Sequence, residues 1–295
     1  DTWRLIVQVF DSNNNYLFQF GSEGTGDGEF KEPVDLTVDS AGNIYVLDGE
    51  NQNVNKFDSS GNFLLRWGGF GTNPGQLYYP EAIASGPGNV IYIAEESGQS
   101  VQKFDSSGNF LLEFGSQGSG NGQFNLPQDL AVDSSGNVFV VDLFNRRVQK
   151  FDSSGNYLSQ FGSLGTGEGQ FRFTQAIDID GSGNIYVADN DLDRIQKFDS
   201  AGNYITQWGS TGSGDLEFDY IRGVGVSSAG KVYVTDQGRK VVRRFSTTGV
   251  LEAKFGTNPE VYHGSGDGEF STPKGIAVGP DGSVYVAERN NYRVQ

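Results

Sequence analysis

The sequence lacks several residue types on which protein chemistry often depends. It has no cysteine, which excludes structural disulfides, thiolate metal sites and cysteine nucleophiles. It has no methionine and a single histidine, His263, so any histidine-based metal site or catalytic triad would rest on that one residue. No apolar run approaches the roughly 18 residues of a membrane-spanning helix, and we expect no membrane insertion.

Positive charge is also scarce. The chain has 37 acidic and 21 basic residues, a net charge of −16. A protein that follows phosphates needs a basic stripe, so we expect no nucleic-acid partner. The acidic balance, the turns rich in Gly, Asn and Ser, and the absence of Met favour an extracellular or cell-surface location. Because the chain begins at Asp1, we also expect it to be one module of a longer protein.

One aromatic position shows that the chain is built of repeats. Its members are 47 residues apart: Phe10, Phe57, Phe104, Phe151, Phe198 and Phe245. A second marker takes the same step four times and then a step of 52: Pro33, Pro80, Pro127, Thr174, Ile221 and Pro273. The extra five residues form an insertion at 259–263. The sequence therefore predicts six units within a single domain over 1–295.

Each unit contains four short runs with strand character. The runs of the third unit are 129–132, 138–141, 147–151 and 157–161. Asp-Ser-Ser-Gly-Asn turns lie between them, and no segment has the 3.6-residue apolar period of a helix. Four antiparallel strands repeated six times predict an all-β, six-bladed β-propeller, because radial repetition gives every unit the same environment.

A glycine-rich stretch closes each unit, as in GSLGTGEGQF at 162–171. Alone, it fits a phosphate-binding loop. Its recurrence in all six units instead favours a connection from the outermost strand of one blade to the innermost strand of the next. We expect its last residue to fill the space between blades: Phe30, Leu77, Phe124, Phe171, Phe218 and Phe270.

The third unit carries a family resemblance. The stretches PQDLAVD at 127–133, GNVFVVD at 136–142 and NRRVQKF at 145–151 resemble the NHL repeat. The resemblance covers nearly the whole chain and implies a six-bladed propeller. It implies little about activity, since one propeller scaffold hosts many unrelated functions.

The two chain ends overlap in the repeat. Residues 1–8 occupy the same repeat positions as 288–295, so Gln8 and Gln295 are equivalent. We expect the ring to close by joining the N-terminal strands to the C-terminal blade, where Ile6-Val7-Gln8 and Arg293-Val294-Gln295 compete for one place. This leaves three interpretations: a fragment of a longer chain, an overlapping closure, or self-assembly in which one end pairs with a neighbouring propeller, even into a filament.

Function is expected where one unit departs from the others. Asp178 lies on an innermost strand where the other five units have Thr, Ala or Gly. Together with Asp35 and Asp129 it predicts three carboxylates near the central channel, held by hydrogen bonds to the backbone or to water, or holding a cation. The acidic stretch Asp189, Asp191, Asp193 and the turn Asp178, Asp180 are further candidates for calcium, although neither has the full spacing of a calcium loop.

Two charged positions recur. Acids close the second strand of every unit: Asp48, Glu95, Asp142, Asp189, Asp236 and Glu288. We expect them to cap the following loop or to pair with its arginine, and to make one face acidic. Bases recur on the third strand: Lys56, Lys103, Lys150, Lys197 and Arg244. We expect these to be solvated at the rim, where they protect the sheets from edge-to-edge pairing.

Large apolar and aromatic residues are scattered in the variable loops: Phe70, Tyr78, Tyr79, Leu143, Phe144, Tyr220, Tyr262 and His263. Loops between blades and loops between the second and third strands share one face of a propeller, so these side chains are candidates for a partner-binding patch or for ordinary loop packing.

The sequence thus favours a non-enzymatic interaction or structural module, without a cofactor, that binds a protein, peptide or glycan through its loop-rich face. The alternative is a hydrolase or lactonase in which Asp35, Asp129 and Asp178 hold calcium in the channel. A further alternative is a subunit of a propeller assembly.

Overall fold

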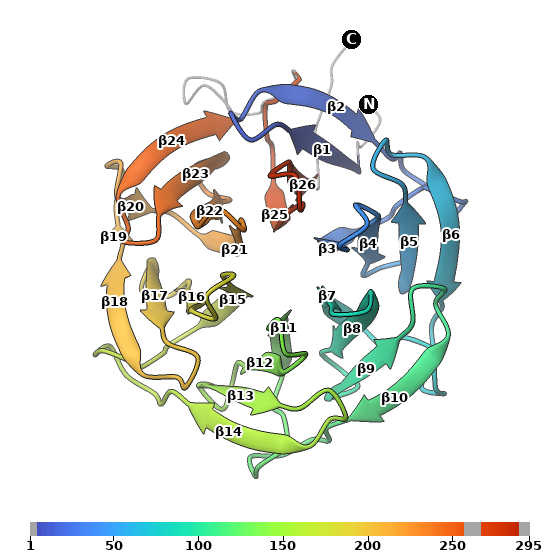
Figure 1. Cartoon of the computed structure of the whole chain (residues 1–295), viewed down its shortest axis with the longest axis horizontal. Coiled ribbons are helices and arrows are strands. Elements are labelled where there is room, and N and C mark those ends of the chain that lie inside the picture. Colours follow the sequence, from blue (N-terminus) through green and yellow to red (C-terminus); the bar gives the residue numbers. More distant parts are fainter. Residues whose placement is uncertain (1–4, 257–266, 289–295) are drawn as a thin grey trace.

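The computed structural model describes residues 5–256 and 267–288. These residues contain strands and turns but no helix, and the strands form a closed ring of six antiparallel four-stranded sheets around a central channel (Figure 1). The all-β, six-bladed propeller predicted from the repeat is confirmed. Within each blade the first strand in the repeat lies innermost and the fourth lies at the rim.

The blades have the following strands. Blade 1 has β3 (Pro33–Val38), β4 (Ile44–Asp48), β5 (Asn53–Phe57) and β6 (Phe63–Gly68). Blade 2 has β7 (Pro80–Gly86), β8 (Val90–Glu95), β9 (Ser100–Phe104) and β10 (Phe110–Phe114). Blade 3 has β11 (Pro127–Val132), β12 (Val138–Asp142), β13 (Arg147–Phe151) and β14 (Tyr157–Phe161).

The second half of the ring repeats this order. Blade 4 has β15 (Thr174–Ile179), β16 (Ile185–Asp189), β17 (Arg194–Phe198) and β18 (Tyr204–Trp208). Blade 5 has β21 (Ile221–Val226), β22 (Lys231–Asp236), β23 (Val241–Ser246) and β24 (Leu251–Gly256). Blade 6 has β25 (Pro273–Val278), β26 (Val284–Glu288), β1 (Ile6–Phe10) and β2 (Tyr16–Phe20). A short parallel pair, β19 (Ser210–Thr211) and β20 (Glu217–Phe218), lies in the connection before blade 5.

The N-terminal strands close the ring. β1 pairs with β26 in register from Ile6 opposite Glu288 to Phe10 opposite Val284, and β2 completes the sheet. Gln8 therefore takes the third-strand place, where its amide donates to Glu288 Oε2 at 2.7 Å and accepts from Gly268 N at 3.0 Å. The predicted closure is confirmed, and the competing residues Arg293 to Gln295 lie outside the described residues.

The hairpin turns follow from the Asp-x-x-Gly-Asn sequence. In the turn at 133–137 the Asp133 carboxylate accepts the N–H groups of Ser135 and Asn137 at 2.9 and 2.8 Å. Gly136 has φ 83°, which glycine adopts without the steric cost of a Cβ. The turn thus satisfies its own backbone, and it does so in the same way at Asp11, Asp39, Asp58, Asp105, Asp152, Asp180 and Asp199.

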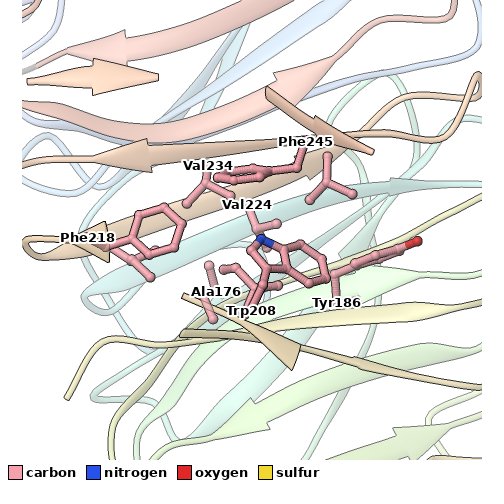
Figure 2. Close-up of a cluster of buried hydrophobic side chains, with 11 residues drawn as sticks. Ala176, Tyr186, Trp208, Phe218, Val224, Val234 and Phe245 are labelled. Atoms are coloured by element: carbon pink, nitrogen blue, oxygen red, sulfur yellow. The ribbon is translucent and has the colours of Figure 1, made fainter. Parts of the chain in front are cut away.

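The hydrophobic core is divided into six clusters, each between two neighbouring blades. Figure 2 shows the cluster between blades 4 and 5, where Phe218 and Trp208 pack on Phe245 with ring centroids 5.8 and 6.0 Å away. Phe218 closes the glycine-rich connection, and its five counterparts are likewise fully buried. Their predicted place between blades is confirmed.

The basic ladder on the third strands corrects an expectation. Lys103 lies with Nζ 5.2 Å from the ring centre of Tyr92 and donates to Ser153 O, in the next blade, at 2.8 Å. The equivalent bases make the same bond to the following blade: Lys56, Lys150, Lys197 and Arg244. These groups are half-buried or buried rather than solvated, because each tethers two blades.

Candidate functional site: the loop-rich face and the channel mouth

One face of the ring gathers most of the variable sequence. There the innermost strands begin, the second strands end, and the connections between blades meet the loops between second and third strands. We call this the loop-rich face, and the end of the channel that opens on it the channel mouth. The ring of acids closing the second strands and those large apolar and aromatic candidates that the structure describes belong to it.

The ring of acids is structural. Asp142 is fully buried, accepts the N–H of Asn125 at 2.7 Å and pairs with Arg147 Nε at 2.7 Å. Each of the other five acids also accepts an N–H from the connection that enters its own blade. All six are at most 3% exposed. The expectation that they make this face acidic was therefore wrong. Asp236 pairs with Arg243 on the third strand, and it caps the following loop by accepting the main-chain N–H of Arg239 at 3.0 Å.

The glycine-rich connections are scaffold, as expected. The N–H of Gly169 donates to Gln196 Oε1, on the third strand of the blade that the connection enters, at 2.9 Å. The equivalent glycines bond in the same way, to Asn55, Gln102, Gln149 and Gln8. An amide committed to a side chain is not free to hold a phosphate.

The channel aspartates tie neighbouring blades together. Asp129 on β11 accepts the N–H of Ile177 on β15 at 2.7 Å, and Asp35 accepts that of Ile83 at 2.9 Å. Asp178 accepts the N–H of Val226 on β21 at 2.6 Å. Innermost strands are sheet edges with unpaired N–H groups, so a carboxylate on the neighbouring blade satisfies them. The predicted hydrogen bonding to backbone is what the structure shows.

These carboxyls also line a cavity of about 160 Å³ in the channel. Burial raises the pKa of both Asp35 and Asp178 to about 7, against the hydrogen bonds that favour their charged forms. Burial, with the nearby Asp35 charge, also raises the pKa of Asp129 well above its usual range. The channel therefore holds acids that are partly protonated at neutral pH.

The calcium candidates do not converge. The Asp180 carboxylate accepts three hydrogen bonds from Ser182 and Asn184 of its own turn and one from Tyr186. Asp191 pairs with Arg172 at 2.9 Å on the surface, while Asp189 and Asp193 accept backbone N–H groups. Nowhere in 5–256 and 267–288 do three His, Cys, Asp or Glu side chains gather as a metal site would require. The calcium hypothesis stays a prediction, tested below.

Three of the predicted aromatic residues form one exposed cluster, which we call the aromatic trio. Phe70 and Tyr78 have ring centroids 5.8 Å apart, and Tyr78 and Tyr79 are 5.3 Å apart. Phe70 is 66% exposed and Tyr79 51%. Tyr79 has φ 51°, a left-handed conformation that is costly for a bulky residue. Its N–H donates a hydrogen bond to Gln52 Oε1 at 3.4 Å.

The other aromatic candidates are distributed. Phe144, beside the entrance to blade 3, has Arg146 5.5 Å from its ring centre, and Tyr220, at the entrance to blade 5, has Arg222 at 6.0 Å. Both rings are exposed, but no ring contact within the described residues links them to the trio. Leu143 is only 2% exposed, which excludes it from a surface patch and fits the alternative of ordinary loop packing. Tyr262 and His263 lie outside the described residues.

A ring of six residues at the channel mouth was not predicted from the sequence. They occupy the second position of each innermost strand: Val34, Glu81, Gln128, Gln175, Arg222 and Lys274. All six line the same cavity, which shares the lining residues Asp35 and Asp129 with the channel cavity. Comparing the units one residue after the proline would have found them, since this position differs between almost all blades.

The mouth contains both signs of charge. Lys274 is buried and pairs with Glu32 at 2.9 Å. Arg222 and Glu81 lie three blades apart, on opposite sides of the ring, and neither has a hydrogen bond or ion pair with any described residue. Burial raises the pKa of Glu81 to about 7, with Lys274 and Arg222 acting to lower it and Glu96 and Glu32 to raise it.

Comparison with known proteins agrees with this architecture. The family model of the NHL repeat matches residues 124–151 and 270–295, and a family model described as a 6-bladed beta-propeller matches residues 1–66. The fold defines a six-bladed β-propeller. More narrowly, the chain carries NHL repeats in the two stretches that the NHL-repeat model matches, as the resemblance in its third unit implied. No curated protein is similar to it in sequence.

Several solved structures share the fold at low identity. A catalytically inactive virginiamycin B lyase from Staphylococcus aureus, solved with quinupristin, is 14% identical with a TM-score of 0.62, over 95% of this chain and 87% of that one. Kuenenia stuttgartiensis hydrazine synthase is 12% identical with a TM-score of 0.60, over 94% and 84%. A Bacteroides thetaiotaomicron protein of unknown function is 17% identical with a TM-score of 0.67, over 96% and 73%. These likenesses show the fold alone.

The described residues also contain no helix of the length and apolar character that crosses a membrane.

Proposed function

We propose that this propeller is a non-enzymatic binding module whose loop-rich face holds a protein, peptide or glycan outside the cell. The observation that carries the proposal is the aromatic trio of Phe70, Tyr78 and Tyr79, in which two rings are more than half exposed in the entrance to blade 2. Exposed aromatic groups held in mutual contact are typical anchors of binding surfaces, because they bury large area at small entropic cost.

The backbone supports this assignment. Tyr79 takes a left-handed conformation, and backbone strain in a bulky residue persists where the surrounding structure holds it. The hydrogen bond from its N–H to Gln52 and the bond from Glu96 N to its carbonyl at 2.9 Å fix the main chain on both sides. The ring is thus presented to solvent on a rigid support, which reduces the cost of ordering it on binding.

The chemistry of the chain supports a binding role rather than catalysis. The ring of acids and the channel aspartates are engaged in hydrogen bonds of the scaffold. The sequence has no cysteine nucleophile and a single histidine, and the carboxyls of Asp35 and Asp178, whose pKa values are raised, hold neighbouring blades together. The proposed extracellular location rests on composition.

Binding assays that compare a variant of the aromatic trio with a matched control variant test the proposal. A glycan array and a displayed peptide library are probed with the wild-type chain and with the double variant Phe70→Ser, Tyr79→Ser. The control is Leu111→Ser, Leu158→Ser, two outer-strand residues that are 48% and 49% exposed. We expect ligands that bind wild type and control but lose about tenfold or more in affinity on the trio variant. Ligands that bind all three proteins equally, or no ligand from either source, would contradict the proposal.

A further inference from the structure

The channel mouth has a charge arrangement that the scaffold does not use. Glu81 on β7 and Arg222 on β21 line one cavity from opposite sides, with two blades between them in either direction around the ring (Figure 1). No described residue forms a hydrogen bond or ion pair with either of them. Most charged groups of the inner ring behave differently: Lys274 pairs with Glu32, and the channel aspartates accept backbone N–H groups.

A neutral group between them is also unsatisfied. Gln175 on β15 is 5% exposed, lines the same cavity, and its amide oxygen accepts no hydrogen bond within the described residues. A buried polar atom without a partner costs about 1–3 kcal/mol, so such atoms are usually matched by water or a ligand. Gln128, on the neighbouring blade, adds a second amide to the same wall.

The cavity has room for a small molecule. The mouth, of about 40 Å³, adjoins the channel cavity of about 160 Å³, and the two share the lining residues Asp35 and Asp129. A protein cavity of about 150 Å³ is known to accept a molecule of the size of benzene. The lining is mainly polar, which suits a hydrated, charged ligand better than a hydrocarbon.

We propose that the channel mouth binds a small zwitterion of the α-amino-acid type, with its carboxylate at Arg222 and its ammonium group at Glu81. The guanidinium of arginine presents paired N–H donors that match a carboxylate, and a carboxylate accepts from an ammonium group. Gln175 then supplies an acceptor to the same ligand. Neither an anion nor a cation alone satisfies both charged walls. This site is independent of the aromatic trio, so either proposal can fail alone.

Thermal unfolding with a panel of the common amino acids at millimolar concentration finds the ligand, because a compound that binds only the folded state raises Tm. Calorimetry then compares the best amino acid with its methyl ester, which keeps only the positive charge, and its N-acetyl derivative, which keeps only the negative one. We expect both derivatives to bind about tenfold or more weakly. A panel in which no amino acid binds overturns the proposal, and so does an ester or acetyl derivative that binds as well as its parent.

Variants of Arg222 and Glu81 test which end of the ligand each residue binds. Arg222→Gln and Glu81→Gln are each expected to weaken the amino acid about tenfold or more, whereas Arg66→Gln, at the rim, leaves its affinity unchanged. The exchanged pair Glu81→Arg, Arg222→Glu recovers binding in part, with the ligand reversed. Circular dichroism melting shows that each variant is folded. Unchanged affinity in both single variants would place the ligand elsewhere and overturn the assignment.

Discussion

The main-chain N–H of Leu126 donates a 2.9 Å hydrogen bond to Oε1 of Gln99, which lies 27 residues earlier in the preceding blade. Leu126 has φ 62°, although it is a bulky residue. Tyr79 and Tyr220 share both features, with Gln52 and Asp193 as acceptors. Where the earlier residue is Arg146 or Lys240, which have no acceptor, the corresponding Phe173 and Thr272 have no positive φ. A side-chain acceptor on one blade thus accompanies a residue with positive φ at the entrance to the next blade.

Removing that acceptor is expected to destabilise the entrance. In Gln99→Ala the Leu126 N–H loses its partner, at a cost of about 1–2 kcal/mol in the free energy of unfolding. Leu126→Gly should lessen this loss in the double variant, because glycine adopts a positive φ without steric strain. Urea unfolding of the two single variants and the double variant measures the coupling. Gln117→Ala, at an exposed loop position, is the control, and a Gln99→Ala value equal to that control would refute the coupling.

The channel carboxyls predict an unusual dependence on pH. The pKa of Asp178 is about 7 in the folded chain, against about 3.9 in an unfolded one, so folding favours its protonated form. Its contribution to stability is therefore complete below the unfolded pKa and is lost as pH rises through the folded value. Relative to Asp178→Asn, wild type should lose stability across this window by up to about 1.4 kcal/mol per pH unit.

Urea unfolding at a series of pH values measures this difference. Asp58→Asn serves as a comparison, because hydrogen bonds from Asn62 lower the pKa of that exposed carboxyl. Its stabilising effect should be present above the unfolded pKa and lost as pH falls through the folded value, which is the opposite sign. If the difference in the free energy of unfolding between wild type and Asp178→Asn stays constant with pH, Asp178 has the same pKa in the folded and the unfolded chain, and the prediction is wrong.

The tether between blades predicts a measurable role for Lys103. Lys103→Met keeps most of the apolar stem over Tyr92 but removes the charge and the hydrogen bond to Ser153 O. The expected loss is about 1 kcal/mol, which lowers Tm by roughly 2–4 °C. Lys31→Met is the control, because Lys31 pairs with Glu50 only at the surface. Equal melting of the two variants would mean that the tether adds no stability.

Calcium is expected to leave the stability of the described scaffold unchanged. Asp178 already accepts N–H groups from Ile179 and Val226, so a cation would have to compete with bonds that tie two blades together. Thermal unfolding in calcium and in chelator, for wild type and for Asp178→Ala, tests this. A rise in Tm with calcium that the variant abolishes would instead support the channel cation site.

The fold was predictable because every blade repeats the same local chemistry. The 47-residue step from Phe57 to Phe104 sets the length of the unit, and the turn at Asp133 specifies the hairpin between its first two strands. Closure followed from the equivalence of Gln8 and Gln295. The site was less predictable. Arg222 and Glu81 lie far apart in the sequence and come to line one cavity only when six innermost strands enclose a channel. The burial of Leu143 depends on the conformation of its loop.

The ring can close only late in the synthesis of this protein, because its first strand pairs with its last. The bond from Gln8 to Glu288 joins residues 280 positions apart, and β1 has no partner on its inner side until β26 exists. At about 5–20 residues per second, the ribosome needs on the order of tens of seconds to supply it. During that interval the apolar Ile6–Phe10 can pair only with β2, leaving one edge of a hairpin open. A nascent chain is therefore most exposed to wrong pairing before its last blade emerges.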